Sequence, residues 1–358
     1  MQDEIYVSTE GVEPALRNDV WRAITGSLFE TRLPPGNRKA LLEGSVSLIP
    51  FGGLLVGTTT FNQQTYHRNQ RLVVQTGLDQ YLLQLFTAGS LNGHCDGHAI
   101  SVLAGDICIF DLARVASTVV TPGQTISMIL PRGPLDQANR GRSLHGTVLR
   151  AGEPMTRVLT DLLMGLPTVA ASMTNQETLA VEDAMLRLLA AGAARHELDA
   201  LPHSLALSQV FKQQALAFID ANLYERTLSP DALVRRFQIS RAYLYRMFAA
   251  DGGVAKVIRD KRLDASYRAI LRNTRGAQSI TDIAFQLGFS NSSQFARAFR
   301  TRFAMTPTEA RQESNQPSSM DWAISGLHAH FARHSQQTEL RPEPARRESA
   351  SAVEAECA

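Results

Sequence analysis

Cysteine is scarce in this 358-residue chain, which has only Cys95, Cys108 and Cys357 and no C-x-x-C pair. An odd number of widely spaced cysteines argues against a disulfide framework and fits a reducing compartment, so we expect a cytoplasmic protein. Long apolar runs are also missing. The longest stretch without a charged residue, 44–66, contains a proline and several glycines and threonines, which predicts strands and turns and excludes a membrane span. The N-terminus has no basic stretch followed by an apolar core, so we expect no signal peptide.

Catalytic motifs are absent as well. The chain has no G-x-S-x-G, no phosphate-binding glycine loop and no H-E-x-x-H. Its one cluster of metal-ligating residue types is NGHCDGH, with His94, Cys95, Asp96 and His98. A metal site needs three or four convergent ligands, whereas Asn-Gly and Asp-Gly are turn signals. We therefore favour a turn over a metal site, which His67 and Glu43 would complete only by coincidence, and we expect no metal, cofactor or catalytic residue.

Charge is unevenly distributed although the net charge is only +2. Residues 211–313 hold 17 basic and 9 acidic side chains, whereas the rest of the chain holds 19 basic and 25 acidic ones. This asymmetry predicts a basic C-terminal module with a polyanionic partner. A charged, solvated helical surface would produce the same count, so charge alone leaves both alternatives open.

Short strands dominate the pattern from about residue 46 to residue 131. They are rich in β-branched and apolar residues and are separated by glycine-containing turns, at 81–89, 98–103, 106–111, 117–121 and 125–130. Strands at about ten-residue intervals predict a sandwich or barrel.

Helical periodicity follows the strands. Apolar residues recur every three or four positions in 154–166, which we expect to end at Gly165–Pro167, and again in 176–192. These two helices are expected to pack as an antiparallel pair, either as a dimer seam or simply against the β domain. We interpret residues 197–208 as a linker and expect residues 211–312 to be helical. The remaining tail is rich in Ser, Glu, Pro and Arg and is expected to be disordered, with a short helix at 320–331.

The segment LSPDALVRRFQIS (228–240) has a clear helix start. Ser229 can cap the helix, Pro230 suits its first turn, and Asp231 favours the positive end of the helix dipole. A three-residue break then precedes a second helix that starts near Arg241. A helix, a short turn and a helix form the unit that places its second helix in the DNA major groove.

A second copy of this unit spans residues 279–303. Ser279 and Asp282 resemble a capping box, and Gly288 permits the turn. Each copy places an arginine, Arg246 or Arg297, between two large apolar residues four positions apart. The doubled pattern predicts two DNA-reading helices.

The helix between the copies, 253–273, carries an apolar stripe that both units can share. Twenty residues span about 30 Å, and one turn of B-DNA advances about 34–36 Å. A connector of this length can hold two reading helices in successive major grooves.

Residues 211–312 resemble the DNA-binding domain of AraC/XylS-type bacterial transcription regulators. The resemblance rests on SRAYLYRMF, on KRLDAS and above all on IAFQLGFSNSSQFARAFRTRFAMTPTEAR. The chain departs from the family pattern at Gln238 and Ala304, where glycine is usual, and at Ala310, where tyrosine is usual. The resemblance implies DNA base-facing positions at Arg241, Ala242, Tyr245, Arg246, Ser292, Ser293, Gln294 and Arg297. Phosphate-facing positions are expected at Arg235, Arg236, Lys256, Arg259, Arg300 and Arg302.

The strand-rich segment and its helix pair more loosely resemble the sensor half of the same regulators, a cupin-like barrel with dimerising helices. The expected fold class is α+β. The expected organisation is a cupin-like β sensor domain at 1–150, a helical pair at 151–196, a linker at 197–210, a tandem helix-turn-helix domain at 211–313 and a disordered tail at 314–358.

The function that this organisation implies is a sequence-specific regulator that responds to a small molecule of unknown identity. We expect it to be an activator rather than a repressor and to form a homodimer. Its partners would be promoter DNA and RNA polymerase, with no membrane. The alternative is a cupin-type metal enzyme with an appended helical interaction domain.

Overall fold

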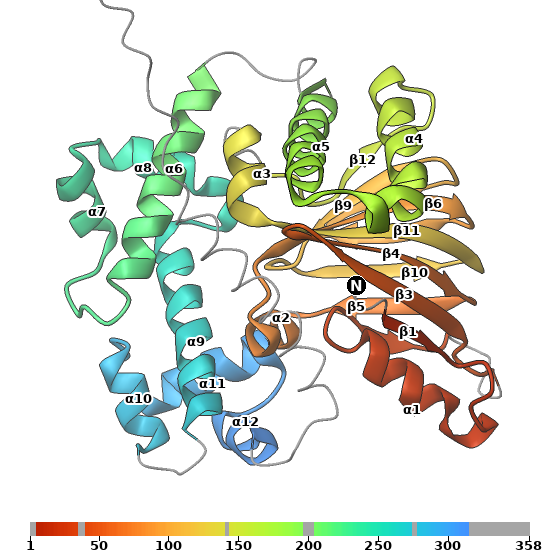
Figure 1. The fold of residues 1–358 in the computed structure, drawn as a ribbon. Helices are drawn as coiled ribbons and strands as arrows, with labels where there is room; N and C mark the ends of the chain where they lie inside the picture. The colour runs from red at the N-terminus through yellow and green to blue at the C-terminus, as the bar shows by residue number, and fades with distance from the viewer. Residues whose placement is uncertain (1–4, 35–39, 140–142, 196–203, 274–277, 315–358) are drawn as a thin grey trace, which may run out of the picture.

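The chain folds into a sheet-rich N-terminal part and a helical C-terminal part that lie side by side (Figure 1). The computed structural model describes residues 5–34, 40–139, 143–195, 204–273 and 278–314. The expected α+β fold class is confirmed. Within the described ranges, every helix is too short or too polar to cross a lipid bilayer. The expected helix at 320–331 and the tail lie outside these ranges.

Two antiparallel sheets form the N-terminal part. The larger has the strand order β1-β3-β4-β11-β6-β9-β12 and the smaller β2-β5-β10-β7-β8. The strands of the larger sheet are β1 (Ile5–Ser8), β3 (Gly44–Phe51), β4 (Leu54–Phe61), β6 (Gln80–Ala88), β9 (Ile107–Asp111), β11 (Gly123–Pro131) and β12 (Thr147–Leu149). Those of the smaller are β2 (Glu30–Arg32), β5 (Gln64–Arg68), β7 (Leu91–Cys95), β8 (His98–Val102) and β10 (Ala116–Val120). Strand pairing among the described residues does not join the sheets into one closed barrel.

The inner faces of the two sheets share a hydrophobic core. Phe61, Phe86 and Phe110 come from the larger sheet, and Leu91 and Val120 from the smaller one. Successive side chains of a strand point to opposite faces of the sheet, so every second residue faces this core. Along β10, Ala116, Thr118 and Val120 are buried, while the residues between them are exposed.

Helix α1 (Pro14–Thr25) is anchored to this core by Trp21. The indole is fully buried, and its Nε1 donates a hydrogen bond to Gln64 Oε1 at 2.6 Å. Gly44 allows the close approach, because a Cβ there would lie 2.4 Å from both the Trp21 ring and the Thr60 carbonyl oxygen.

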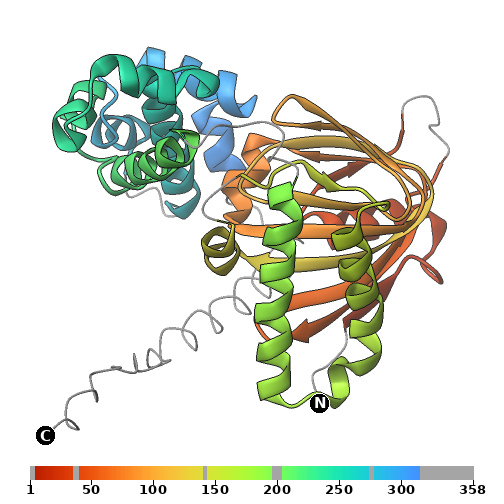
Figure 2. The same ribbon diagram turned by 90° about the horizontal axis from the view of Figure 1, so that it is seen from above.

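Three helices cover the outer face of the larger sheet (Figure 2): α3 (Arg132–Ala138), α4 (Pro154–Val169) and α5 (Asn175–Arg195). A short 3-10 turn, Ala170–Ser172, joins α4 to α5, and the expected helix pair is confirmed. The expected end of the first helix at Gly165–Pro167 was wrong, since α4 runs through Pro167 to Val169. Pro167 lies in the last turn, where it removes one backbone hydrogen bond, to the carbonyl of Leu163.

The C-terminal part is entirely helical. It contains α6 (Ser204–Ala221), α7 (Pro230–Phe237), α8 (Arg241–Met247), a 3-10 turn (Ala249–Asp251), α9 (Val254–Arg272), α10 (Ile280–Gln286), α11 (Ser292–Phe303) and α12 (Pro307–Ser314). The expected linker at 197–210 was wrong in its second half. The sequence from Ser204 onward has no glycine or proline and continues into the helix that buries Ala215 and Ile219.

One core joins both helix-turn-helix units to α9. Leu244 of the first unit and Phe295 of the second belong to the same buried cluster as Ile258, Leu263 and Tyr267 of α9. The expected shared stripe is confirmed. Figure 1 shows the two units at opposite ends of α9, which at 19 residues is about 28 Å long.

The predicted helix starts are also confirmed. Ser229 Oγ accepts a hydrogen bond from the Ala232 amide, and Ser279 and Asp282 form a reciprocal capping box. At two positions the chain has another residue where the AraC/XylS pattern has glycine. Both have left-handed backbone, with φ of 52° at Gln238 and 57° at Ala304. An L-residue in that conformation costs about 1–2 kcal/mol relative to the right-handed one.

Ala304→Gly and Gln238→Gly are therefore expected to stabilise the C-terminal part. The relief of left-handed strain exceeds the extra chain entropy that glycine loses on folding, and we expect a gain of up to about 1 kcal/mol each. The free energy of unfolding from urea titration checks this. Ala296→Gly, inside right-handed α11, is the matched control and should destabilise by about 1 kcal/mol. If Ala304→Gly destabilises as much as the control, the strain assignment is wrong.

Candidate nucleic-acid interface and internal cavity

The first candidate reading helix, α8, is capped by Ser240, whose Oγ accepts a hydrogen bond from the Tyr243 amide. Leu244 and Phe248 are buried on its inner side. The four residues predicted to face DNA bases all lie on the exposed side: Arg241, Ala242, Tyr245 and Arg246. The face is therefore free to meet a partner, and Tyr245 presents an aromatic ring that is 46% exposed.

Arg241 has a partner within the fold. Its Nη2 donates to Asp231 Oδ1 at 2.5 Å, across the turn between α7 and α8. The Asp231 carboxylate raises the pKa of Arg241, chiefly through this hydrogen bond. Both side chains are exposed, so the pair can open when a stronger anion arrives. Asp231, predicted to serve the helix start, also orients this arginine.

The second candidate reading helix, α11, is capped by Asn291, whose Oδ1 accepts from the Ser293 and Gln294 amides. Phe295, Phe299 and Phe303 are buried along one side. At 3.6 residues per turn, Arg297 lies opposite this buried stripe. The predicted positions on the outer face are all exposed: Ser292, Ser293, Gln294 and Arg297.

Most of the predicted phosphate-facing cations are exposed as well. They are Arg235 and Arg236 on α7, Lys256 and Arg259 on α9, and Arg300 on α11. Lys256 Nζ donates a hydrogen bond to Asp260 Oδ2 at 2.9 Å, one helical turn away, while the lysine itself is half exposed.

Arg302 differs from the other predicted phosphate contacts. Its Nε and Nη2 bind the two Asp264 carboxylate oxygens at 2.6 and 2.8 Å, and its Nη1 lies 3.1 Å from Asp260 Oδ2. Burial of the pair raises the pKa of Asp264, and the two carboxylates raise the pKa of Arg302 against the opposing effect of burial. This guanidinium is neutralised inside the fold, where it joins α11 to α9.

A surface groove brings candidate base and phosphate contacts together. Lys256 and Arg259 of α9 and Gln294 and Arg297 of α11 line the same hollow. Gln70 of the sheet-rich part lines it too.

Gln70 belongs to α2 (Gln70–Thr76), a helix inside the region read as strands. α2 contacts both α9 and α11, and Val74 is buried in the same cluster as the helical core. Gln70 Nε2 lies 3.3 Å from both Asp264 oxygens, beside Arg302. We call the packing of Gln70 and Val74 against α9 and α11 the α2 contact. It ties the sheet-rich part to the second helix-turn-helix unit.

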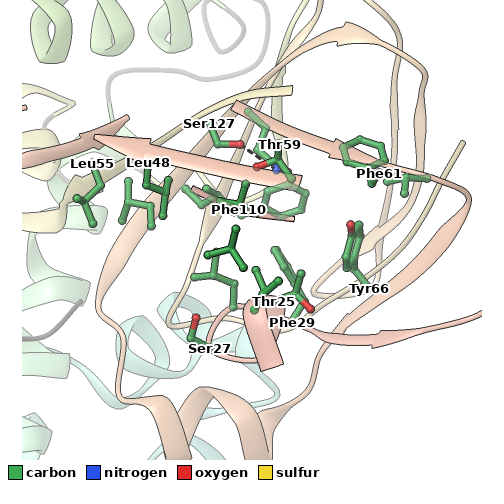
Figure 3. Close-up of a pocket in the computed structure, with 18 of the residues that line it drawn as sticks. Thr25, Ser27, Phe29, Leu48, Leu55, Thr59, Phe61, Tyr66, Phe110 and Ser127 are labelled. Atoms are coloured by element: carbon green, nitrogen blue, oxygen red, sulfur yellow. Dashed lines mark hydrogen bonds between the residues drawn. The ribbon is translucent and has the colours of Figure 1, made fainter. Parts of the chain in front are cut away.

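A cavity of about 410 Å³ lies between the two sheets (Figure 3). The end of α1, the loop after it and strands of both sheets line the cavity. The lining includes Ser27 and Phe29 of the loop and Phe61, Tyr66 and Phe110 of the strands. Small-molecule pockets commonly measure about 300–1,000 Å³ and are mainly apolar.

The NGHCDGH segment forms a hairpin. Cys95 pairs with His98 across Asp96 and Gly97, which have φ of 47° and 83°. The turn predicted at Asp-Gly is confirmed, whereas Asn92-Gly93 lies inside β7. No group of three or more potential metal ligands occurs in the described part of the chain. Cys95 and Cys108 are free, and burial raises the pKa of the Cys95 thiol to about 12.

Two sets of residues were missed from sequence. The first is α2. Asn69 caps this helix and Gly77 ends it in the left-handed conformation, which are recognisable start and stop signals. We overlooked them because the surrounding sequence is typical of strands. The second is the cavity lining, which combines residues as distant as Ser27 and Ser127 and has no local signal.

Two family models match the chain in the order of its two parts. Residues 21–193 match an AraC-binding-like domain, and residues 233–313 match a helix-turn-helix domain.

Curated relatives align over both parts. The transcriptional activator NphR of Rhodococcus is 25% identical over 276 residues, 74% of this chain and 79% of its own. The Msm operon regulatory protein of Streptococcus mutans is 22% identical over 242 residues, 66% and 85% of the two chains. Among solved structures, the AraC-like transcriptional activator CuxR covers 73% of this chain and 94% of its own, with a TM-score of 0.51 and 22% identity, which supports the fold.

Val74→Asp is expected to open the α2 contact, because it places a carboxylate in an apolar interface at a cost of several kcal/mol. Hydrogen exchange of the α2 amides should accelerate at least tenfold, which corresponds to about 1.4 kcal/mol. Val74→Ile keeps the apolar character and should leave exchange unchanged. Equal exchange in Val74→Asp and wild type would show that α2 does not depend on the helical part.

Proposed function

Because the chain belongs to the AraC type of DNA-binding transcription regulators, we propose that α8 and α11 read base edges in two successive major grooves. The observation that carries this proposal is the repeated arginine. Arg246 and Arg297 stand at equivalent, exposed positions of two capped helices that share one core with α9.

The side chains suit direct readout. Arg246 and Arg297 can each donate two parallel hydrogen bonds to guanine O6 and N7, and Gln294 can bind adenine N6 and N7. Ala242 can contact a thymine methyl group. In this proposal Arg241 exchanges Asp231 for a base or a phosphate, and Tyr245, Ser292 and Ser293 complete the two faces.

The exposed cations around these helices supply affinity that does not depend on sequence. Arg235, Arg236, Lys256, Arg259 and Arg300 would contact phosphates, and each contact releases counterions. Arg302 is left out of this set, since Asp264 and Asp260 already hold its guanidinium.

The cavity is the proposed effector site. Its position between the sheets separates it from the DNA-reading helices, so an effector would act through contacts between the two parts. Arg68 offers one route. This buried side chain donates to the Leu28 carbonyl at 2.7 Å beside the cavity and to Thr76 Oγ1 of α2 at 3.0 Å, and α2 contacts α9 and α11.

We further propose that the protein acts as an activator in the cytoplasm, on promoter DNA and together with RNA polymerase. The outer faces of α4 and α5 are the proposed homodimer seam, where Val158, Met164 and Leu179 are exposed. The rival function, a cupin-type metal enzyme, predicts about one metal ion per chain. Metal analysis of the purified protein distinguishes the two, since a regulator needs none.

Arg246→Ala and Arg297→Ala are expected to weaken binding to a DNA site selected by the full chain from a random library. A lost bidentate guanine contact costs about 1–3 kcal/mol, or about 5- to 150-fold in affinity. Gel shifts on the selected site and on single-base variants measure the loss, which should concentrate at one guanine for each variant. Arg22→Ala, an exposed arginine of α1 with the same charge change and outside both the reading helices and the proposed dimer seam, is the control. If base preference survives in both variants, the reading helices are wrongly assigned.

Arg236→Ala is expected to act differently. Loss of one phosphate contact should weaken selected and scrambled sites alike and reduce the slope of log K against log salt by about 0.9. A salt series on both DNAs checks this. A selective loss on the chosen site alone would assign Arg236 to a base.

A further inference from the structure

The described lining of the cavity between the sheets is neutral. Among the described residues that line it there is no Asp, Glu, Lys, Arg or His. An ion that entered would lose its hydration without gaining a counter-charge, which costs several kcal/mol.

Arg68 does not supply the missing charge. It lies two residues from Tyr66 on β5, and it is outside the cavity lining. Its Nε donates to the Leu112 carbonyl at 2.7 Å, and its other two nitrogens bond the Leu28 carbonyl and Thr76 Oγ1. Neutral acceptors therefore already occupy all three guanidinium nitrogens.

Aromatic rings form much of the wall. Phe61 lies 6.3 Å from Phe86 at an interplanar angle of 68°, and 6.4 Å from Tyr66 at 88°. Phe29 lies 6.1 Å from Phe110 at 78°. These edge-to-face arrangements suit one more ring, since aromatic pairs prefer tilted or offset geometry.

Neutral hydrogen-bonding groups also face the cavity. The hydroxyl groups of Thr59, Tyr66 and Thr118 form no hydrogen bond with other described residues. Gln84 Nε2 reaches Ser127 Oγ at 3.4 Å, which is a long contact. Figure 3 shows Thr59 beside Ser127, and Tyr66 lies farther along the cavity. These hydroxyl groups line the open cavity, so a bound molecule with one or two polar atoms can form hydrogen bonds with them.

We propose that this cavity binds an uncharged aromatic molecule of one or two rings with a hydroxyl, carbonyl or similar neutral group, and that it discriminates against organic anions such as fatty acids. This inference rests on the proposed role of the cavity as the effector site. The ring of the ligand packs among the phenylalanines, and its polar atom bonds Gln84 and the free hydroxyl groups.

The test is a calorimetric titration of the full chain at pH 7.5 with 2-naphthol and 2-naphthoate. The two probes share their rings, and only the second is charged at this pH. We expect 2-naphthol to bind at least tenfold more tightly than 2-naphthoate and than the fatty acid palmitoleate. Equal or tighter binding of either anion, or no binding of 2-naphthol, overturns the proposal.

Two variants locate the binding. Thr118→Met fills the cavity and should weaken 2-naphthol at least tenfold, whereas Ser117→Met, its exposed neighbour on β10, should not. Gln84→Lys adds a cation to the wall and should make 2-naphthoate bind more tightly than 2-naphthol. Circular dichroism verifies that each variant is folded. An unchanged order in folded Gln84→Lys contradicts the proposed position of the polar group.

Failure of this inference and failure of DNA recognition can be told apart. A chain that binds its selected DNA site and does not bind 2-naphthol disproves the ligand class only. A chain that binds 2-naphthol and shows no preference among DNA sites disproves the proposed readout only.

Discussion

The packing of α9 against both helix-turn-helix units is the constraint on which the DNA-reading geometry depends. Leu244 and Phe248 on one side and Phe295 and Phe299 on the other join the α9 side chains in one buried cluster. Because this core is continuous, neither reading helix can rotate without disturbing the other. The exposed faces therefore keep a fixed separation, as the proposed recognition of two successive grooves requires.

The same helix carries the connection to the sheet-rich part. Asp264 of α9 accepts two hydrogen bonds from Arg302 of α11 and lies within reach of Gln70 of α2. α2 in turn is linked through Thr76 and Arg68 to the carbonyl of Leu28, which lines the cavity. The chain of contacts from cavity to reading helix is thus short and made of buried and half-buried groups. Such groups tolerate few alternative arrangements, which is the property that a ligand-biased switch needs.

Local signals predicted much of this fold and failed where contacts are distant in sequence. Caps at Ser229 and Ser279 and the stripe of α9 are properties of neighbouring residues, so the helices could be placed. Arg302 was assigned to phosphate because nothing local shows that Asp264, 38 residues earlier, faces it. The resemblance implied a sensor domain that holds a small molecule, but its lining residues could not be predicted, since strand register alone brings Tyr66 and Thr118 together across β5 and β10.

Methylation interference on a selected DNA site tests the central claim most directly, because methylated guanine N7 blocks contacts in the major groove only. Two interfering clusters should appear on one face of the duplex, about 10–10.5 base pairs apart. Arg246→Ala should remove one cluster and Arg297→Ala the other. A single cluster, or two clusters on opposite faces of the duplex, would contradict recognition by two helices held on α9.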